Sequence, residues 1–268
     1  MRFPLVIIVA LSCAACATTA GIDRAVAPPP PPSCSFSGSQ VVHSAEGEPG
    51  QGQSHRLVAW TLDDTPELWR PILPDSPSLH SFRDAVVRLT SIRAEPHDDH
   101  AKAIIEHEYR RQLADPTLQR EAELNRRLLL ELGDVKPMRC FEALLFARQA
   151  DRLDMVTRPT EFLALVFRSA DQRRLRILEY TVDAPGIGRV GRVMEHAEPL
   201  LASGEWHFWT ALHNHNFFFE SDGWHGGSVA PSGPDTQLLA VWRDRFGLDE
   251  YWITNGFSTA IRKASDLD

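Results

Sequence analysis

The stretch that decides the fold is Trp206-His-Phe-Trp-Thr-Ala-Leu-His213-Asn-His215-Asn216, an apolar run that ends in two histidines one residue apart. Side chains at i and i+2 of a β-strand point to the same face, so a strand over Trp206–Leu212 presents both imidazoles in one direction. A carboxylate follows at Asp235, where an apparent helix begins. Two imidazoles and one carboxylate suit a catalytic zinc ion, which keeps a fourth position for water. The sequence therefore predicts a metal centre of His213, His215 and Asp235.

A single acid interrupts the apolar run Arg139-Cys-Phe-Glu142-Ala-Leu-Leu-Phe146 further upstream. We expect this run to form a β-strand. A lone carboxylate in such a strand either faces solvent or belongs to a functional site, because burial of an unpaired charge is costly. Glu142 is therefore the candidate for the general base that a metal-bound water requires.

The remaining hydrophobic patterns predict an α/β fold. A helical period runs from about Asp98 to Leu132 and is interrupted at Asp115-Pro116, which predicts two helices or one kinked helix. Trp69–Ser81 carries several prolines and is predicted to be extended, and the Gly- and Ser-rich stretch from Phe36 to Gln53 is predicted to be a loop. The other predicted elements are strands at His55–Leu62, Glu161–Arg168 and Arg174–Val182, and helices at Val190–Ser203 and Asp235–Phe246.

The order of Glu142, the His-x-His pair and Ser232-x-x-Asp235 resembles that of the JAMM metalloproteases, the catalytic branch of the MPN fold, which includes deubiquitinating isopeptidases. The resemblance covers about Lys136 to Ile261. It implies an MPN-like mixed β-sheet flanked by helices and zinc-dependent hydrolysis of a protein or peptide substrate. It also implies that His213, His215 and Asp235 bind zinc, that Glu142 activates the metal-bound water, and that Ser232 helps to hold the oxyanion.

The sequence departs from the family pattern near the histidines. Asn216 stands where the family usually has proline, and Leu145 stands where a glycine normally follows the glutamate. The segment Phe217–Ser228 is an insertion rich in glycine and aromatic residues, and we expect it to be a mobile flap over the site. Its polar residues are alternative metal ligands to Asp235, with carboxylates at Glu220 and Asp222 and an imidazole at His225.

The N-terminus carries an export signal. Met1-Arg2, the apolar run Phe3–Leu11 and the small residues around Cys13 and Cys16 are typical of a secretory signal peptide. A cysteine at this point resembles the lipidated residue of a bacterial lipoprotein, with a plain signal peptide as the alternative. Since no aspartate follows either cysteine, we expect a lipid anchor on the periplasmic face of the outer membrane. The prolines Pro28–Pro32 predict a stiff spacer.

These signals divide the chain into four parts: a lipoprotein signal peptide at 1–16, a proline-rich tether at 17–36, a mostly helical extension at 37–135, and the metalloprotease-like domain at 136–268. Cys34 and Cys140 are the cysteines left outside the signal region. In an oxidising compartment such a pair predicts one disulfide, and two buried free thiols are the alternative.

Composition and the other motifs bound the functional classes. The net charge of −8 and the lack of a basic cluster argue against nucleic-acid binding. Gly186-Ile-Gly188-Arg-Val-Gly191 matches a dinucleotide fingerprint, but no acid follows about twenty residues later, so a simple strand-to-helix turn is favoured. Three histidines, His97, His100 and His107, are expected to face solvent on an acidic helix. A non-catalytic lipoprotein that serves as an envelope scaffold remains the alternative to an enzyme.

Overall fold

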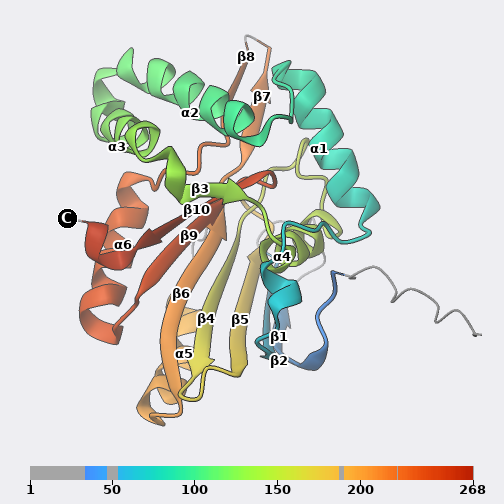
Figure 1. The fold of residues 1–268 in the computed structure, drawn as a ribbon, viewed down its shortest axis with the longest axis vertical. Helices are drawn as coiled ribbons and strands as arrows, with labels where there is room; N and C mark the ends of the chain where they lie inside the picture. Colours follow the sequence, from blue (N-terminus) through green and yellow to red (C-terminus); the bar gives the residue numbers. More distant parts are fainter. Residues whose placement is uncertain (1–33, 47–53, 187–189, 222, 268) are drawn as a thin grey trace, which may run out of the picture. The chain divides into compact units, whose positions relative to one another are not determined.

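The computed structural model describes residues 34–46, 54–186, 190–221 and 223–267, which form a mixed α/β fold (Figure 1). The large sheet contains eight strands: β1 (Gly38–Glu46), β2 (His55–Asp63), β3 (Val135–Pro137), β4 (Phe162–Ser169), β5 (Arg174–Val182), β6 (Trp206–Asn214), β9 (Glu250–Thr254) and β10 (Ser258–Lys263). Their order is β1-β2-β5-β4-β6-β9-β10-β3. Within this sheet β6 and β9 pair in parallel, and the other neighbours pair in antiparallel.

Helices cover both faces of the sheet. They are α1 (Pro77–Thr90), α2 (His97–Leu113), α3 (Gln119–Leu130), α4 (Cys140–Ala150), α5 (Val190–Ala202) and α6 (Gly233–Phe246). Apolar side chains of α1 and α4 pack with Phe162, Ala164 and Val166 of β4 in one core cluster. Those of α3, α5 and α6 pack with Leu163, Leu165 and Phe167 in the other. Because successive residues of a strand point to opposite faces, these two clusters mark the two sides of the sheet.

The segment between residues 37 and 135 is not a separate compact unit. It supplies β1 and β2, and β2 pairs with β5 over its whole length, from His55 opposite Val182 to Asp63 opposite Arg174. Residues from Pro32 to the C-terminus cluster as one unit. The boundary expected at residue 135 therefore falls inside a continuous fold, in which α1, α2 and α3 pack against the same core.

Three sequence-based assignments are wrong. The predicted strand around Glu142 is the helix α4, the predicted loop after Phe36 contains β1, and the end of the predicted extended segment at Trp69–Ser81 begins α1. α4 is buried on almost every side, so its sequence is mostly apolar and has no clear helical period. Its helical state agrees with alanines at 143, 147 and 150, which favour helix.

A disulfide joins Cys34 to Cys140, the first residue of α4, as expected for the two cysteines outside the signal region. Next to it, Phe36 packs against Trp60 and Phe141. The bridge therefore fixes the start of the described chain to the α4 side of the sheet. The signal region, Cys13, Cys16 and the proline run lie outside the described residues. Among the residues described, no helix has the length and apolar character needed to cross a membrane.

The insertion after the second histidine forms a two-stranded hairpin of β7 (Phe217–Glu220) and β8 (Gly223–Gly226) beside α2 (Figure 1). Trp224 of β8 stacks on His107 of α2 at 3.8 Å between ring centroids, and its carbonyl lies 2.9 Å from the His107 Nε2 atom. Glu108 accepts a hydrogen bond from the backbone of Gly226. The expected mobile flap is thus a hairpin docked on α2 by ring stacking and hydrogen bonds.

Candidate metal centre

Strand β6 brings the two histidines to the edge of the α3–α5–α6 side of the sheet. His213 pairs with Leu163 of β4, which belongs to the core cluster on that side. The strand ends at Asn214, but the backbone N–H of His215 still donates to the Thr254 carbonyl at 2.8 Å, which keeps the chain extended. The period of two therefore turns both imidazoles the same way, as the sequence predicted.

Helix α6 supplies the carboxylate. Ser232 is its N-cap, and Asp235 occupies the third helical position. The Ser232 hydroxyl accepts a hydrogen bond from the Asp235 backbone at 3.3 Å, and the Asp235 Oδ2 atom accepts one from the Ser232 backbone at 2.7 Å. This reciprocal capping box fixes the carboxylate in the first turn, where the helix dipole favours a negative charge.

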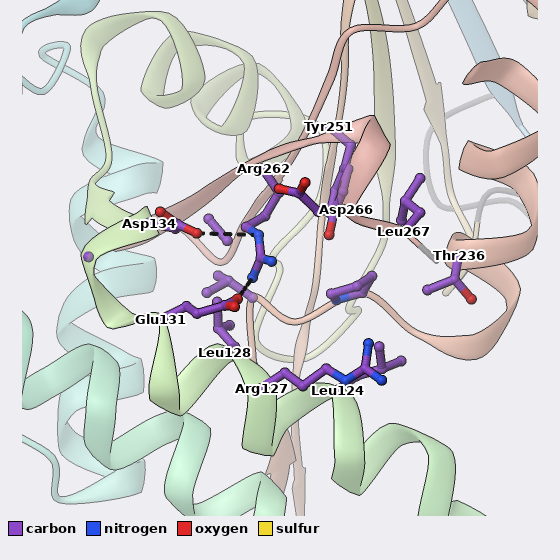
Figure 2. Close-up of a pocket in the computed structure, with 14 residues that line it drawn as sticks. Leu124, Arg127, Leu128, Glu131, Asp134, Thr236, Tyr251, Arg262, Asp266 and Leu267 are labelled. Carbon is purple, nitrogen blue, oxygen red and sulfur yellow. Dashed lines mark ion pairs between the residues drawn. The ribbon is translucent and has the colours of Figure 1, made fainter. Parts of the chain in front are cut away.

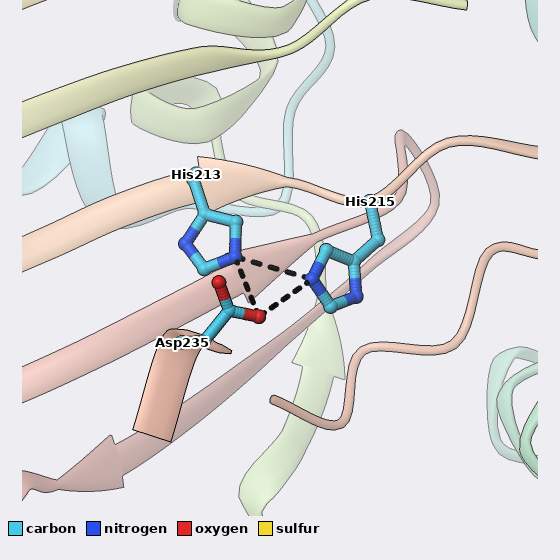
Figure 3. Close-up of side chains that lie close together, drawn as sticks. All are labelled: His213, His215 and Asp235. Atoms are coloured by element: carbon cyan, nitrogen blue, oxygen red, sulfur yellow. Dashed lines mark hydrogen bonds and ion pairs between the residues drawn. The ribbon is translucent and has the colours of Figure 1, made fainter. Parts of the chain in front are cut away.

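The three side chains converge on one point (Figure 3). The Nε2 atoms of His213 and His215 are 3.2 Å apart, and the Asp235 Oδ2 atom lies 3.5 Å from the first and 3.2 Å from the second. Two ligands on a tetrahedral zinc ion, each at about 2.0 to 2.1 Å, are roughly 3.4 Å apart. The three separations match the edges of such a tetrahedron. Among the described residues no other group of three His, Cys, Asp or Glu side chains converges in this way.

Electrostatics couples the three groups. Burial would raise the pKa of the Asp235 carboxyl, but the charges of His213 and His215 and their hydrogen bonds outweigh it and hold that pKa well below its usual value. Burial would lower the pKa of His215, but the Asp235 hydrogen bond and charge, with smaller contributions from Glu161 and the Ser228 carbonyl, raise it overall. The carboxylate is therefore ionised and ready to bind a cation.

The orientation of the His215 ring is fixed by its other nitrogen. Nδ1 lies 2.7 Å from the Ser228 carbonyl oxygen, which accepts hydrogen bonds only. Nδ1 therefore carries the proton, and the Nε2 lone pair of the neutral ring faces Asp235 and His213. A carbonyl that orients the imidazole in this way is the usual support of a metal-binding histidine.

A carboxylate that the sequence reasoning missed lies beside the histidines. Glu161 is the residue directly before β4. Leu163 of β4 lies opposite His213 of β6 in an antiparallel pair. Continuing this register by two residues places Glu161 opposite His215, on the same face of the sheet as Leu163 and His213. Burial raises the pKa of Glu161, while the charges of His215 and His213 lower it and that of Asp235 raises it. Glu161, His215 and Ser232 line one cavity of about 230 Å³.

Glu142 lies elsewhere. It is fully buried in α4, which packs on the opposite side of the sheet from the His213 and Leu163 pair. Its Oε2 atom accepts a hydrogen bond from the Arg139 backbone at 3.0 Å, and its Oε1 atom accepts from the Arg139 Nε atom at 2.8 Å and from an Nη atom. Glu142 is a helix-capping residue paired with Arg139, and the structure does not bring it to the metal centre.

The other sequence candidates fall into two groups. Ser232 lines the cavity, and its hydroxyl proton remains available because the oxygen accepts from the Asp235 backbone. Glu220 and His225 face each other on the hairpin, with the carboxylate 3.3 Å from the imidazole, and neither belongs to the three-residue cluster. The side chain of Asp222 lies outside the described residues.

Two other sequence features have structural explanations. Of the three histidines expected to face solvent, His100 is buried against Phe257, His97 contacts the Ser258 hydroxyl, and His107 stacks on Trp224. The expectation was wrong because α2 is covered by the hairpin and by the β9–β10 turn. The glycine run Gly186–Gly191 spans the passage from β5 to α5, and its middle residues lie outside the described part.

A second described cavity, with a volume of about 570 Å³, lies elsewhere (Figure 2). It lies between α3, β9, β10 and the start of α6, and contains none of the three cluster residues. Arg262 fills part of its wall and forms ion pairs with Glu131 and Asp134. Pro231 borders both this cavity and the smaller one beside His215. Of the two cavities, only the smaller one is lined by a member of the three-residue cluster, His215.

Comparisons of the chain with known protein families, with curated proteins and with solved structures found no significant match.

Proposed function

We propose that the protein is a zinc-dependent peptide or isopeptide hydrolase of the bacterial cell envelope. The observation that carries this proposal is the convergence of the His213 and His215 Nε2 atoms and the Asp235 Oδ2 atom, at separations of 3.2 to 3.5 Å. They occupy three corners of a tetrahedral site next to a cavity, and a catalytic zinc site leaves its fourth position open.

The residues around the site have distinct roles in this proposal. His213, His215 and Asp235 would hold a zinc ion, which would lower the pKa of a bound water so that it could lose a proton near neutral pH. Glu161 accepts the proton of that water and returns it to the leaving amine. The Ser232 hydroxyl donates a hydrogen bond to the oxyanion of the tetrahedral intermediate.

Glu161 replaces Glu142 as the proposed base for geometric reasons. A general base must reach the proton that it removes, directly or through one water. The Glu161 side chain lines the cavity with His215, whereas both oxygens of Glu142 are bound by Arg139 on the other side of the sheet. Burial also raises the pKa of Glu161, which is the direction expected for a carboxylate that accepts a proton.

The element order supports an MPN-like arrangement. From β4 onward, β5, helix α5, the histidine strand β6 and then α6 with Ser232 and Asp235 follow one another in the order predicted from the sequence, whereas the Glu-bearing strand expected before them is the helix α4. The envelope location and the lipid on Cys13 or Cys16 rest on the N-terminal sequence alone.

Metal analysis of the purified soluble domain tests the proposal. We expect about one zinc per chain in the wild type and none in His213→Ala. Incubation with a proteome-derived peptide library, read by mass spectrometry, should then show cleavage that a chelator abolishes and zinc restores. The scaffold alternative predicts a folded protein with neither zinc nor cleavage.

A further inference from the structure

Helices α2 and α3 bury three polar side chains where amphipathic helices normally bury apolar ones. Glu108, Gln112 and Asn125 are only 2%, 9% and 3% exposed. Burial of polar groups is unfavourable unless hydrogen bonds satisfy them, and a buried carboxylate needs several. These residues lie before Lys136, outside the part of the chain that resembles the JAMM family, so that resemblance assigns them no role.

The three side chains form one continuous chain of hydrogen bonds. The Gln112 Nε2 atom donates to the Glu108 carboxylate at 3.3 Å, and the Asn125 Nδ2 atom donates to the Gln112 Oε1 atom at 2.8 Å. The Ser228 hydroxyl then donates to the Asn125 Oδ1 atom. The chain thus runs from α2 through α3 to the segment that follows β8.

The end of this chain is the residue that orients a metal ligand. The Ser228 carbonyl accepts the Nδ1 hydrogen bond of His215, and the Ser228 Oγ atom accepts from the Ala230 backbone at 3.2 Å. Two residues earlier, the Gly226 backbone donates to Glu108 at 2.8 Å. The α2–α3 pair therefore holds this segment at two points, the Gly226 backbone and the Ser228 hydroxyl, next to the carbonyl that contacts His215.

We infer that Glu108, Gln112, Asn125 and Ser228 are positioning residues for His215, so that the N-terminal helices α2 and α3 complete the metal centre. They fix the place of the Ser228 carbonyl, and this carbonyl fixes the tautomer and tilt of the imidazole. Their effect on metal binding rests on the proposed function, whereas their effect on the His215 ring does not.

Two measurements test the inference. The first is the ¹⁵N chemical shifts of the His215 ring in metal-free protein at pH 8.5, which report the proton on Nδ1. We expect one Nδ1-protonated form in the wild type and a mixture of tautomers in Ser228→Ala, which keeps the carbonyl but loses the bond to Asn125. The second is zinc affinity by chelator competition, which should weaken about tenfold in Ser228→Ala, at the low end of the ~10- to 100-fold range for lost outer-shell partners.

Controls separate positioning from general stability. Ser169→Ala is a matched variant, because Ser169 is also buried and its hydroxyl also makes hydrogen bonds, with Asp171 and Arg174, at the far end of β4. It should lower the thermal midpoint of the metal-free protein but leave zinc affinity and the His215 shifts unchanged. Ser228→Thr retains the hydroxyl and should restore both readouts. The Ser228→Ala and Asn125→Ala double variant should bind zinc no more weakly than the weaker single variant, since both remove the same bond.

Each result decides the inference. A single unchanged His215 tautomer in Ser228→Ala and Asn125→Ala overturns it, as does an equal loss of zinc affinity in Ser169→Ala. A wild-type protein that binds no zinc but shows the predicted tautomer change would end the proposed hydrolase function and leave the positioning role in place.

Discussion

Two glutamates, the fully buried Glu142 and the half-buried Glu161, should respond to the same substitution in opposite ways. Glu142→Gln leaves the Arg139 guanidinium without its carboxylate. Breaking a fully buried ion pair costs about 3 to 5 kcal/mol, and loss of a helix cap costs roughly 1 kcal/mol. The Arg139 side chain is 19% exposed and keeps its cation–π contact with Trp252, and glutamine can still accept at the helix N-terminus. We therefore expect a loss of about 2 to 3 kcal/mol.

Glu161→Gln should have the opposite effects, with little change in stability and a large loss of activity. The Glu161 carboxylate has no hydrogen-bond donor among the described side chains, and its burial disfavours the charge. Its replacement should change the free energy of unfolding by less than about 1 kcal/mol. Zinc content should stay at the wild-type level, because Glu161 is not one of the three converging ligands. Peptide cleavage should fall by about 10² to 10⁴-fold, the usual contribution of a general base.

Urea unfolding, zinc analysis and kinetics on a cleaved library peptide measure these effects. At a slope of about 2 to 3 kcal/mol per molar urea, the Glu142→Gln midpoint should fall by roughly 1 M, with kcat nearly unchanged at a temperature where the variant is folded. A Glu142→Gln protein of wild-type stability with greatly reduced kcat, or a fully active Glu161→Gln protein, would refute the assignment of the two roles.

Three further outcomes are expected. Asp235→Ala should lose zinc at micromolar total metal, whereas His225→Ala should retain it. If only His225→Ala lost its zinc, the third ligand would be a residue of the hairpin and not Asp235. Burial, with the charges of Arg83 and His97, lowers the pKa of His100 from 6.5 to about 4. The folded protein therefore resists protonation of His100, which costs about 3 kcal/mol of stability for 2.5 pKa units as the pH falls from 6.5 towards 4, and urea titrations should show the wild type losing this much stability relative to His100→Leu over that range. Cys34→Ser should reduce the free energy of unfolding by roughly 2 to 5 kcal/mol, since the bridge spans 106 residues, without changing zinc content.

The three converging residues could be predicted from the sequence because each depends on local geometry. His213 and His215 required only a strand with a period of two, and the apolar run before them predicted that strand. The position of Asp235 depends only on where the helix begins, and Ser232, Gly233 and Pro234 are typical of a helix N-terminus. That Asp235 lies close to the two histidines depends on the tertiary fold. The local sequence does not predict this contact, and it was expected only from the order of these residues in the JAMM family.

The general base was not accessible in the same way, because its place depends on pairing between strands. The sequence favours Glu142 as the base because it is a lone acid in an apolar run, but a fully buried helix has the same pattern as a buried strand. The sequence did contain a usable signal at Glu161, an acid at the start of the next apolar strand. Recognising it requires the antiparallel register that places Leu163 opposite His213.

A metal-free explanation of the cluster is a hydrogen-bonded pair of histidines on an aspartate, and it requires His215 to be an imidazolium. Nδ1 of His215 already donates to the Ser228 carbonyl, so a proton on its Nε2 atom would make that ring a cation. Without that proton, the ring presents an unshared lone pair to the Asp235 oxygen at 3.2 Å, which is repulsive. With that proton, the N–H of the His215 imidazolium lies 3.2 Å from the Nε2 atom of His213. The two histidines then compete for the same Asp235 carboxylate oxygen. A single cation between the three atoms satisfies every lone pair at once. On the proposed function, the inferred positioning of the His215 ring by the polar chain from α2 and α3 would serve this arrangement, because a metal ligand must be held in one tautomer and one orientation.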